Sequence, residues 1–186
     1  SILIVGLRAI SELVGTLFFV ISLFKMPFAN VTAILQILPL AVTVGAALVL
    51  REKFGIRRGV AICLGFVGVL IIIRPGSEGF NWYSILAFLT VLSITCRDLI
   101  TRKLDKNLPV IFIVLVTTIV ITSSGALGVI FYSGWSPMDT SVTISMCIAG
   151  FFLVLGYYFI VDAMRFGMVA VVSPFRYTIM IWAPVS

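Results

Sequence analysis

Apolar runs long enough to cross a lipid bilayer recur along this chain and occupy most of its 186 residues. A membrane-spanning helix needs roughly 20 mainly apolar residues, each adding about 1.5 Å of length. Hydrophobic residues make up 61% of the sequence and charged residues only 11%, whereas a soluble domain has about 25% charged residues. The runs are too long for barrel strands and lack their alternation. We therefore expect an all-α, polytopic membrane protein in contact with the lipid bilayer.

The runs predict seven spanning helices, at 2–24, 29–50, 57–74, 81–101, 108–131, 141–164 and 168–186. The breaks between them are short and carry turn-forming residues, as in "RPGSEGFNW" and "YSGWSPMDT". Connections this short make successive helices antiparallel neighbours in a bundle.

Lysine and arginine predict the orientation of these helices, because cytoplasmic loops carry an excess of both. Eight of the 13 basic residues lie in every second loop: Arg51, Lys53, Arg57, Arg58, Arg102, Lys103, Lys106 and Arg165. The opposite loops hold only Lys25 and Arg74. The loops at 51–58, 102–106 and 165 are therefore expected to face the cytoplasm. The net charge of +6 is explained by this orientation signal, so no nucleic-acid partner is predicted.

Side chains that carry most enzyme chemistry are absent or scattered. The chain has no histidine, and its three cysteines, Cys63, Cys96 and Cys147, lie inside apolar runs at no metal or redox spacing. The seven acidic residues form no paired motif, and no phosphate-binding loop of the Walker type is present. We expect no cofactor, no metal and no enzymatic activity. A membrane-embedded lipid-modifying enzyme and a non-transporting membrane assembly subunit are the alternatives.

Two stretches of the chain resemble each other at an offset of 140 residues: "FKMPFANVTAILQILPL" (24–40) and "MRFGMVAVVSPFRYTIM" (164–180). The offset places Lys25 on Arg165 and Gln36 on Arg176. The equivalent helices are five apart, which is an odd number, so the two units are inverted across the membrane. Inverted repeats are typical of secondary transporters, whose substrate site lies at the repeat interface near the bilayer midplane. The repeat predicts a carrier that moves a small molecule by alternating access.

Residues 26–76 resemble EamA-type carriers of the drug/metabolite transporter superfamily. The matching positions are Pro27, Ala29, Pro39 and Glu52, followed by Gly65, Gly68, Arg74, Pro75 and Gly76. Two further stretches, "RDLITRKL" (97–104) and "VSPFRYTIMIWA" (172–183), are also similar to members of this family.

The resemblance implies ten helices in two inverted five-helix halves, of which this chain matches the third to the ninth. Residues 1–80 then form the C-terminal part of the first repeat, with three helices. Residues 81–186 form the N-terminal part of the second repeat, with four. The resemblance also implies a bacterial inner-membrane location and a small polar or zwitterionic metabolite or drug as substrate. Proton coupling and a homodimer are left open.

Arg176 lies deep in the last predicted span, about 12 Å from either end by the helix rise. A charged side chain at that depth is costly and usually faces a cavity or a charged partner. Pro174 lies two residues earlier and disturbs the hydrogen bonds of the preceding turn. We expect Arg176 and Tyr177 to line the central cavity and bind an anionic or zwitterionic substrate. The alternative is an arginine paired with an acid on a helix outside the part of the carrier that this sequence matches.

Gln36 is the repeat equivalent of Arg176 and lies near Pro39, which is expected to interrupt the helix. Its amide is expected either to bind substrate or to join helices, as polar residues do in lipid. Tyr157 lies deeper than the interfacial aromatic residues and is a further candidate for substrate contact. Packing in the core or against lipid is the alternative for Tyr157.

Arg8 and Glu12 are four residues apart and share one helix face. The favoured interpretation is a local ion pair in which Arg8 reaches the cytoplasmic interface and Glu12 is neutralised. An acid inside a transporter is also a candidate for proton coupling, which is the alternative role of Glu12.

Arg97 and Asp98 lie near the cytoplasmic end of their predicted helix. Adjacent helical residues point about 100° apart, so the two side chains are not expected to face each other, and Arg97 is expected to extend to the interface. A gate ion pair at the inner mouth of the carrier is the alternative. Asp162 is expected to pair with Arg165, three residues later.

Overall fold

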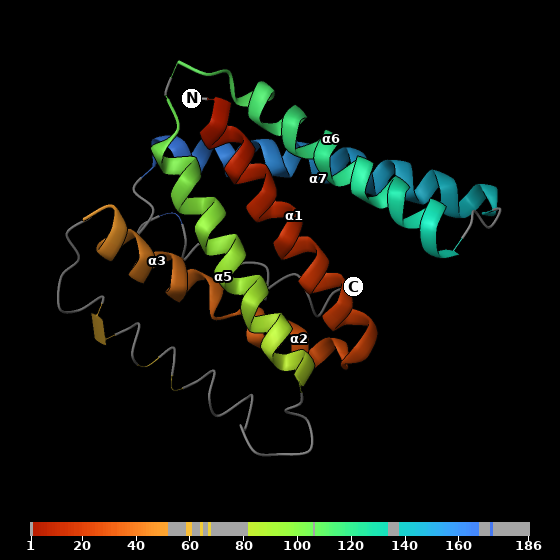
Figure 1. Cartoon of the computed structure of the whole chain (residues 1–186), viewed down its shortest axis with the longest axis horizontal. Helices are drawn as coiled ribbons and strands as arrows, with labels where there is room; N and C mark the ends of the chain where they lie inside the picture. The colour runs from red at the N-terminus through yellow and green to blue at the C-terminus, as the bar shows by residue number, and fades with distance from the viewer. Residues whose placement is uncertain are drawn as a thin grey trace.

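The computed structural model of the chain describes residues 2–51, 59–60, 64, 67, 82–105, 107–133, 138–167 and 172. Over these residues it is helical, with short turns and no strand. The helices are α1 (Ile2–Lys25), α2 (Phe28–Leu35), α3 (Leu38–Val49), α5 (Trp82–Lys103), α6 (Val110–Gly128) and α7 (Thr140–Phe166) (Figure 1). A short π-helix, η1 (Val129–Ser133), continues α6.

Five helical segments in the described ranges are long and apolar enough to cross a membrane: Ile2–Lys25, Asn30–Val49, Trp82–Lys103, Val110–Phe131 and Thr140–Phe166. Their ends differ from those of the corresponding predicted spans by no more than two residues. The all-α prediction is confirmed for this part of the chain, and the five long apolar helices are consistent with a polytopic membrane protein.

The predicted spans 57–74 and 168–186 lie largely outside the described residues, and so do Pro174, Arg176 and Tyr177. The seven-span count, the inverted five-helix repeats and the boundary at residue 80 stay predictions, because they depend on those segments.

Helix α5 contacts α1, α2, α3 and α7, and its longest contact is with α1. Two glycines bring the neighbouring helices close to it. A Cβ added to Gly15 of α1 would lie 3.2 Å from the Cβ of Ser93, and one added to Gly45 of α3 would lie 2.8 Å from Cδ1 of Leu99. Small residues favour helix association in membranes because they let backbones approach closely. A side chain at Gly15 would press on the Cβ of Ser93, which is fixed to the backbone of α5, whereas one at Gly45 would meet the movable end of the Leu99 side chain.

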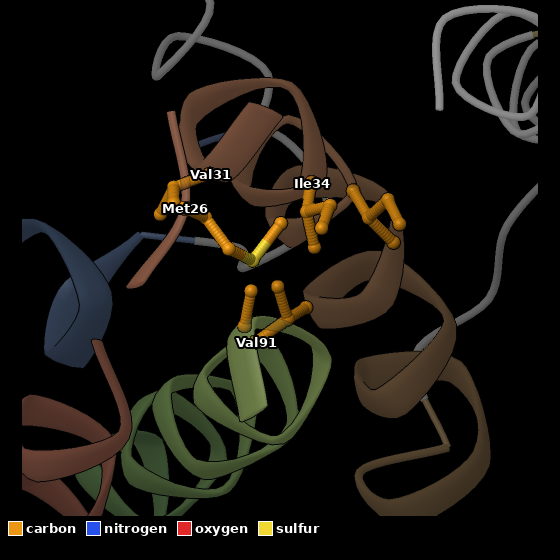
Figure 2. Packing of buried hydrophobic residues seen from close by; sticks show 6 residues of the cluster. Met26, Val31, Ile34 and Val91 are labelled. Atoms are coloured by element: carbon orange, nitrogen blue, oxygen red, sulfur yellow. The ribbon is translucent and has the colours of Figure 1, made fainter. Parts of the chain in front are cut away.

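An apolar cluster joins the α2 region to the half of α5 that is predicted to lie on the outer side (Figure 2). Its buried members are Met26, Val31, Ile34, Ile37, Ala87 and Val91. Figure 2 shows the side chains of Met26 and Ile34 directed towards Val91 across the helix contact. The contact between α2 and α5 within this cluster is apolar.

The span after Lys25 is divided into α2 and α3 by a turn at Gln36 and Ile37. Pro39 lies in the first turn of α3. A proline cannot donate a hydrogen bond to the carbonyl four residues earlier, and its ring clashes with that carbonyl. The backbone N–H of Ile37 instead donates to the carbonyl of Ile34 at 3.0 Å, a tighter turn than the α-helix makes. The helix axis therefore changes at Gln36.

Helices α6 and α7 lie side by side and extend away from the other helices (Figure 1). The buried residues of α6 are Ile113, Val114 and Thr117, and those of α7 are Val161, Met164 and Arg165. Both sets lie at the end where α6 begins and α7 finishes, which is the predicted cytoplasmic end. The rest of both helices exposes large apolar side chains, as expected for surfaces that contact lipid.

Candidate functional site

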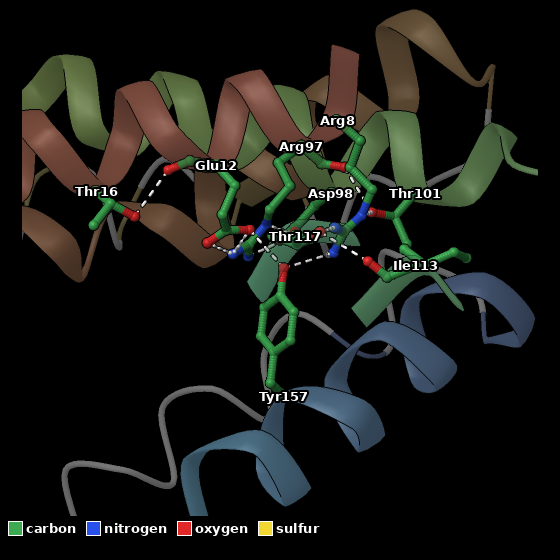
Figure 3. Close-up of polar contacts among 9 residues, drawn as sticks. All are labelled: Arg8, Glu12, Thr16, Arg97, Asp98, Thr101, Ile113, Thr117 and Tyr157. Atoms are coloured by element: carbon green, nitrogen blue, oxygen red, sulfur yellow. Dashed lines mark hydrogen bonds and ion pairs between the residues drawn. The ribbon is translucent and has the colours of Figure 1, made fainter. Parts of the chain in front are cut away.

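Two buried residues on neighbouring helices, Glu12 of α1 and Arg97 of α5, form an ion pair (Figure 3). Nη1 of Arg97 lies 2.7 Å from Oε1 and 2.8 Å from Oε2 of Glu12. Glu12 lies about 15 Å along the axis from the start of α1, and Arg97 about 9 Å from the end of α5. Both ends belong to the predicted cytoplasmic side, so the pair lies between that side and the bilayer midplane.

Arg97 also binds its neighbour in sequence, Asp98. Its Nε donates to Oδ1 of Asp98 at 2.9 Å, and its Nη2 lies 2.7 Å from the same oxygen. Arg97 is 7% exposed and Asp98 2%. The expectations that these side chains do not meet and that Arg97 extends to the interface are therefore wrong. The arginine side chain is long enough to bring its guanidinium back beside Asp98 even though the Cα–Cβ bonds diverge.

Arg8 is buried, with 1% of its surface exposed, and binds three hydroxyl groups on three other helices. Its Nε donates to Oγ1 of Thr101 at 2.8 Å, its Nη1 to Oγ1 of Thr117 at 2.6 Å, and its Nη2 to Oη of Tyr157 at 2.8 Å. The favoured local pair of Arg8 with Glu12 is therefore wrong. Arg8 extends into the bundle, where the hydroxyl groups replace the water that it would find at the interface.

The sequence analysis did not single out the two threonines that hold Arg8. The hydroxyl of Thr101 donates to the carbonyl of Arg97 at 2.8 Å, and that of Thr117 to the carbonyl of Ile113 at 2.9 Å. Because each hydroxyl proton is used within its own helix, the oxygen lone pairs are directed towards the guanidinium. The sequence feature that could have identified them is a hydroxyl residue on α5 and another on α6, each in mainly apolar surroundings and near the same end of the bundle as Arg8.

Tyr157 of α7 links the two arginine centres (Figure 3). Its hydroxyl accepts from Nη2 of Arg8 and donates to Oε2 of Glu12, and both distances are 2.8 Å. The guanidinium of Arg8 also lies 5.6 Å from the centre of the Tyr157 ring, within range of a cation–π contact. Tyr157 is the partly buried member at the edge of the group.

We call this group the ion network; its members are Arg8, Glu12, Arg97, Asp98, Thr101, Thr117 and Tyr157. Two carboxylates balance two guanidinium groups, so the formal charge of the network is zero. Each guanidinium nitrogen of Arg8 and Arg97 has a hydrogen-bond or ion-pair partner within the network. The network therefore joins α1, α5, α6 and α7.

A third buried arginine, Arg165, lies closer to the predicted cytoplasmic end of α7. Its Nη1 donates to the carbonyl of Leu108 at 2.8 Å and its Nη2 to the carbonyl of Asp105 at 2.6 Å. The carbonyl of Arg165 in turn accepts a hydrogen bond from Arg102. Among the described residues Asp162 makes no ion pair with Arg165, so the expected pair is wrong. Arg165 instead holds the turn between α5 and α6 against the end of α7.

Gln36 lies at the turn between α2 and α3 and is half-buried. Its neighbour Ile37 packs in the cluster that contains Val91, and Val91 lies about 9 Å along α5 from Arg97. Substrate contact by Gln36 and by Tyr157 stays a prediction, and Arg176 and Tyr177 lie outside the described residues.

Proteins named riboflavin transporters are similar to this chain. It is 29% identical to one from Rhizobium johnstonii over 174 residues, which are 90% of this chain and 55% of that protein. It is 26% identical to one from Brucella anthropi over 166 residues, 87% of this chain and 58% of that protein. It is 34% identical to one from Vibrio cholerae over 84 residues, 45% of this chain and 28% of that protein.

The chain spans about half the length of the relatives that it matches along most of its own length. No protein-family model matches the chain. No solved structure matches it. The five membrane-length helices and the similarity to named transporters together support an integral membrane protein related to small-metabolite transporters.

Proposed function

We propose that this chain belongs to a secondary transporter that moves riboflavin, or a small polar metabolite of similar chemistry, across a bacterial inner membrane by alternating access. The similarity to named riboflavin transporters over 90% and 87% of this chain carries the proposal. The buried ion network supports it, because ionisable residues inside membrane bundles are rare and usually belong to transport pathways.

The proposed substrate site lies where the two predicted repeats meet, near the bilayer midplane. Riboflavin has a flat ring system with carbonyl oxygens and a chain of hydroxyl groups. Arg176 has donors for such carbonyls, Tyr177 offers a ring for stacking, and Gln36 can both donate and accept hydrogen bonds. Riboflavin is uncharged near neutral pH, so Arg176 would act as a hydrogen-bond donor rather than as a counter-ion.

Uptake measurements test this proposal. The complete reading frame that contains this sequence is expressed in bacterial cells that can neither make nor import riboflavin, and uptake of labelled riboflavin is followed. We expect saturable uptake that is abolished by Arg176→Gln while the amount of protein in the membrane is unchanged. Lys103→Gln is the matched control, since Lys103 lies at the predicted cytoplasmic end of α5 and is exposed.

Saturable uptake that persists in the Arg176→Gln protein would remove Arg176 from the site but leave the transport proposal intact. If the protein moves riboflavin neither into whole cells nor into inverted vesicles, riboflavin is excluded as the substrate.

A further inference from the structure

Helix α7 is attached to the rest of the bundle along less than half of its length. Every residue from Thr140 to Gly156 is exposed, and Tyr157 and Tyr158 are the first that are partly covered. The buried residues, Val161, Met164 and Arg165, follow within the last turns. Tyr157 is therefore the outermost point at which α7 is held against its neighbours in the described part of the chain.

The hydroxyl of Tyr157 makes the polar contact at that point. It bonds both Arg8 and Glu12 of α1, and Glu12 is paired with Arg97 of α5. These contacts cross the predicted boundary between the two repeats, because α1 lies before residue 80 and α7 after it. In alternating access one part of the carrier moves against another, and a movement of α7 away from α1 would break and re-form the Tyr157 contacts.

The contacts that cross the boundary differ in strength. Separating Glu12 from Arg97 leaves a charge without its partner in a buried site, which is strongly unfavourable. Withdrawing the neutral hydroxyl of Tyr157 leaves that ion pair, and the contact of Arg97 with Asp98, in place. The Tyr157 hydrogen bonds can therefore open without separating the charges of the Glu12–Arg97 pair.

We infer that Tyr157 is a positioning residue whose hydroxyl works as a latch, holding α7 against α1 and α5 on the cytoplasmic side of the bundle. When the Tyr157 hydrogen bonds break, α7 can move away from α1 and α5 while the Glu12–Arg97 ion pair remains intact. The latch itself rests on the contacts described here, and its opening during transport rests on the proposed function.

Reactivity of a buried thiol tests the latch without a transport assay. Val161 of α7 is 1% exposed and packs against Val5 and Ile113, so it is covered only while α7 is docked. In the complete protein, with Cys63, Cys96 and Cys147 replaced by serine, Val161→Cys is introduced and its labelling by N-ethylmaleimide is timed in membrane vesicles. We expect Tyr157→Phe to raise the labelling rate about tenfold, the factor that corresponds to about 1.4 kcal/mol.

Two controls are built into the chain. Tyr158→Phe removes the hydroxyl of the adjacent tyrosine, which makes no hydrogen bond in the described structure, and is expected to leave the rate within about twofold. Val91→Cys places the thiol in the cluster between α2 and α5 and is expected to react at the same rate with or without Tyr157→Phe. An unchanged rate at Val161→Cys, or an equal rise at Val91→Cys, would overturn the latch.

Riboflavin separates failure of the latch from failure of the proposed function. If riboflavin is transported, saturating riboflavin is expected to change the labelling rate of Val161→Cys at least about threefold, and the change is expected to disappear with Tyr157→Phe, as population shifts between docked and undocked α7 require. A transported substrate that leaves this rate unchanged would overturn the opening of the latch. A rise with Tyr157→Phe in a protein that transports no riboflavin would support the latch and refute the substrate.

Discussion

The ion network brings two arginines and two carboxylates together inside the helix bundle. Arg97 is the only member that contacts both acids, since it binds Glu12 on α1 and Asp98 on its own helix. Arg8 is held by neutral hydroxyl groups, and only the hydroxyl of Tyr157 lies between it and Glu12. Arg8, Glu12 and Arg97 therefore each depend on partners that come from another helix.

Replacing Arg97 tests this dependence. Arg97→Met keeps most of the side-chain volume but leaves the buried carboxylates of Glu12 and Asp98 without their cation. We expect the protein to lose about 3–5 kcal/mol of stability, seen as a lower melting temperature of the purified protein in detergent. Lys103→Met, at the end of the same helix, is the control and is expected to have the same melting temperature as the unchanged protein. The same melting temperature for both variants would contradict the pairing of Arg97 with Glu12 and Asp98.

Thr117 gives a second prediction at this scale. Thr117→Val has nearly the same shape but leaves Nη1 of Arg8 without its acceptor, so a loss of about 1–3 kcal/mol is expected. The neighbouring Thr118 is exposed, and Thr118→Val is expected to change the melting temperature little. The idea fails if the two valine variants have the same melting temperature.

Sequence reasoning located all four charged residues of the network, but the partners that it favoured were wrong. Spacing within one helix shows which residues share a face, so it suggested Arg8 with Glu12 and Asp162 with Arg165. The observed partners of Arg8 and Arg97 lie mainly on other helices, and they depend on how α1, α5 and α7 are rotated against each other. That rotation is set by packing, which a single sequence does not record.

At the scale of the helices, the apolar runs were sufficient to place five spans, because bilayer thickness fixes their length. The turn at Gln36 and Ile37 follows from Pro39, because its ring and its missing N–H interrupt the helical hydrogen bonds of the preceding residues. The close contact of α1 with α5 was not predicted, since Gly15 became informative only once Ser93 was seen opposite it.

Gly15→Leu tests that helix contact. The larger side chain has no space beside Ser93 and Ile94, so α1 must move away from α5, and a loss of about 1–3 kcal/mol is expected. Gly6→Leu on the same helix is the matched control, because a Cβ there meets nothing within 4 Å. Both variants should insert into the membrane equally well, while only Gly15→Leu should melt at a lower temperature. A lower melting temperature for both would show that the Gly15 contact has no special role.

At the scale of the whole molecule, the described helices form an apolar contact on the predicted outer side and a polar one on the predicted cytoplasmic side. The outer contact contains Met26 and Val91, and the inner one contains the ion network and Arg165. Separating the two charges of a buried ion pair is strongly unfavourable. The ion network therefore holds α1 and α5 together on the predicted cytoplasmic side, as apolar packing holds α2 and α5 together on the predicted outer side.

The central claim is that a carrier containing this chain exposes a riboflavin site alternately to each side of the membrane. The most direct test is counterflow in proteoliposomes that contain the complete protein and are loaded with unlabelled riboflavin. Labelled riboflavin added outside is expected to accumulate transiently above its external concentration, because each inward step is coupled to the return of an occupied site. No accumulation above that of protein-free liposomes would contradict the claim.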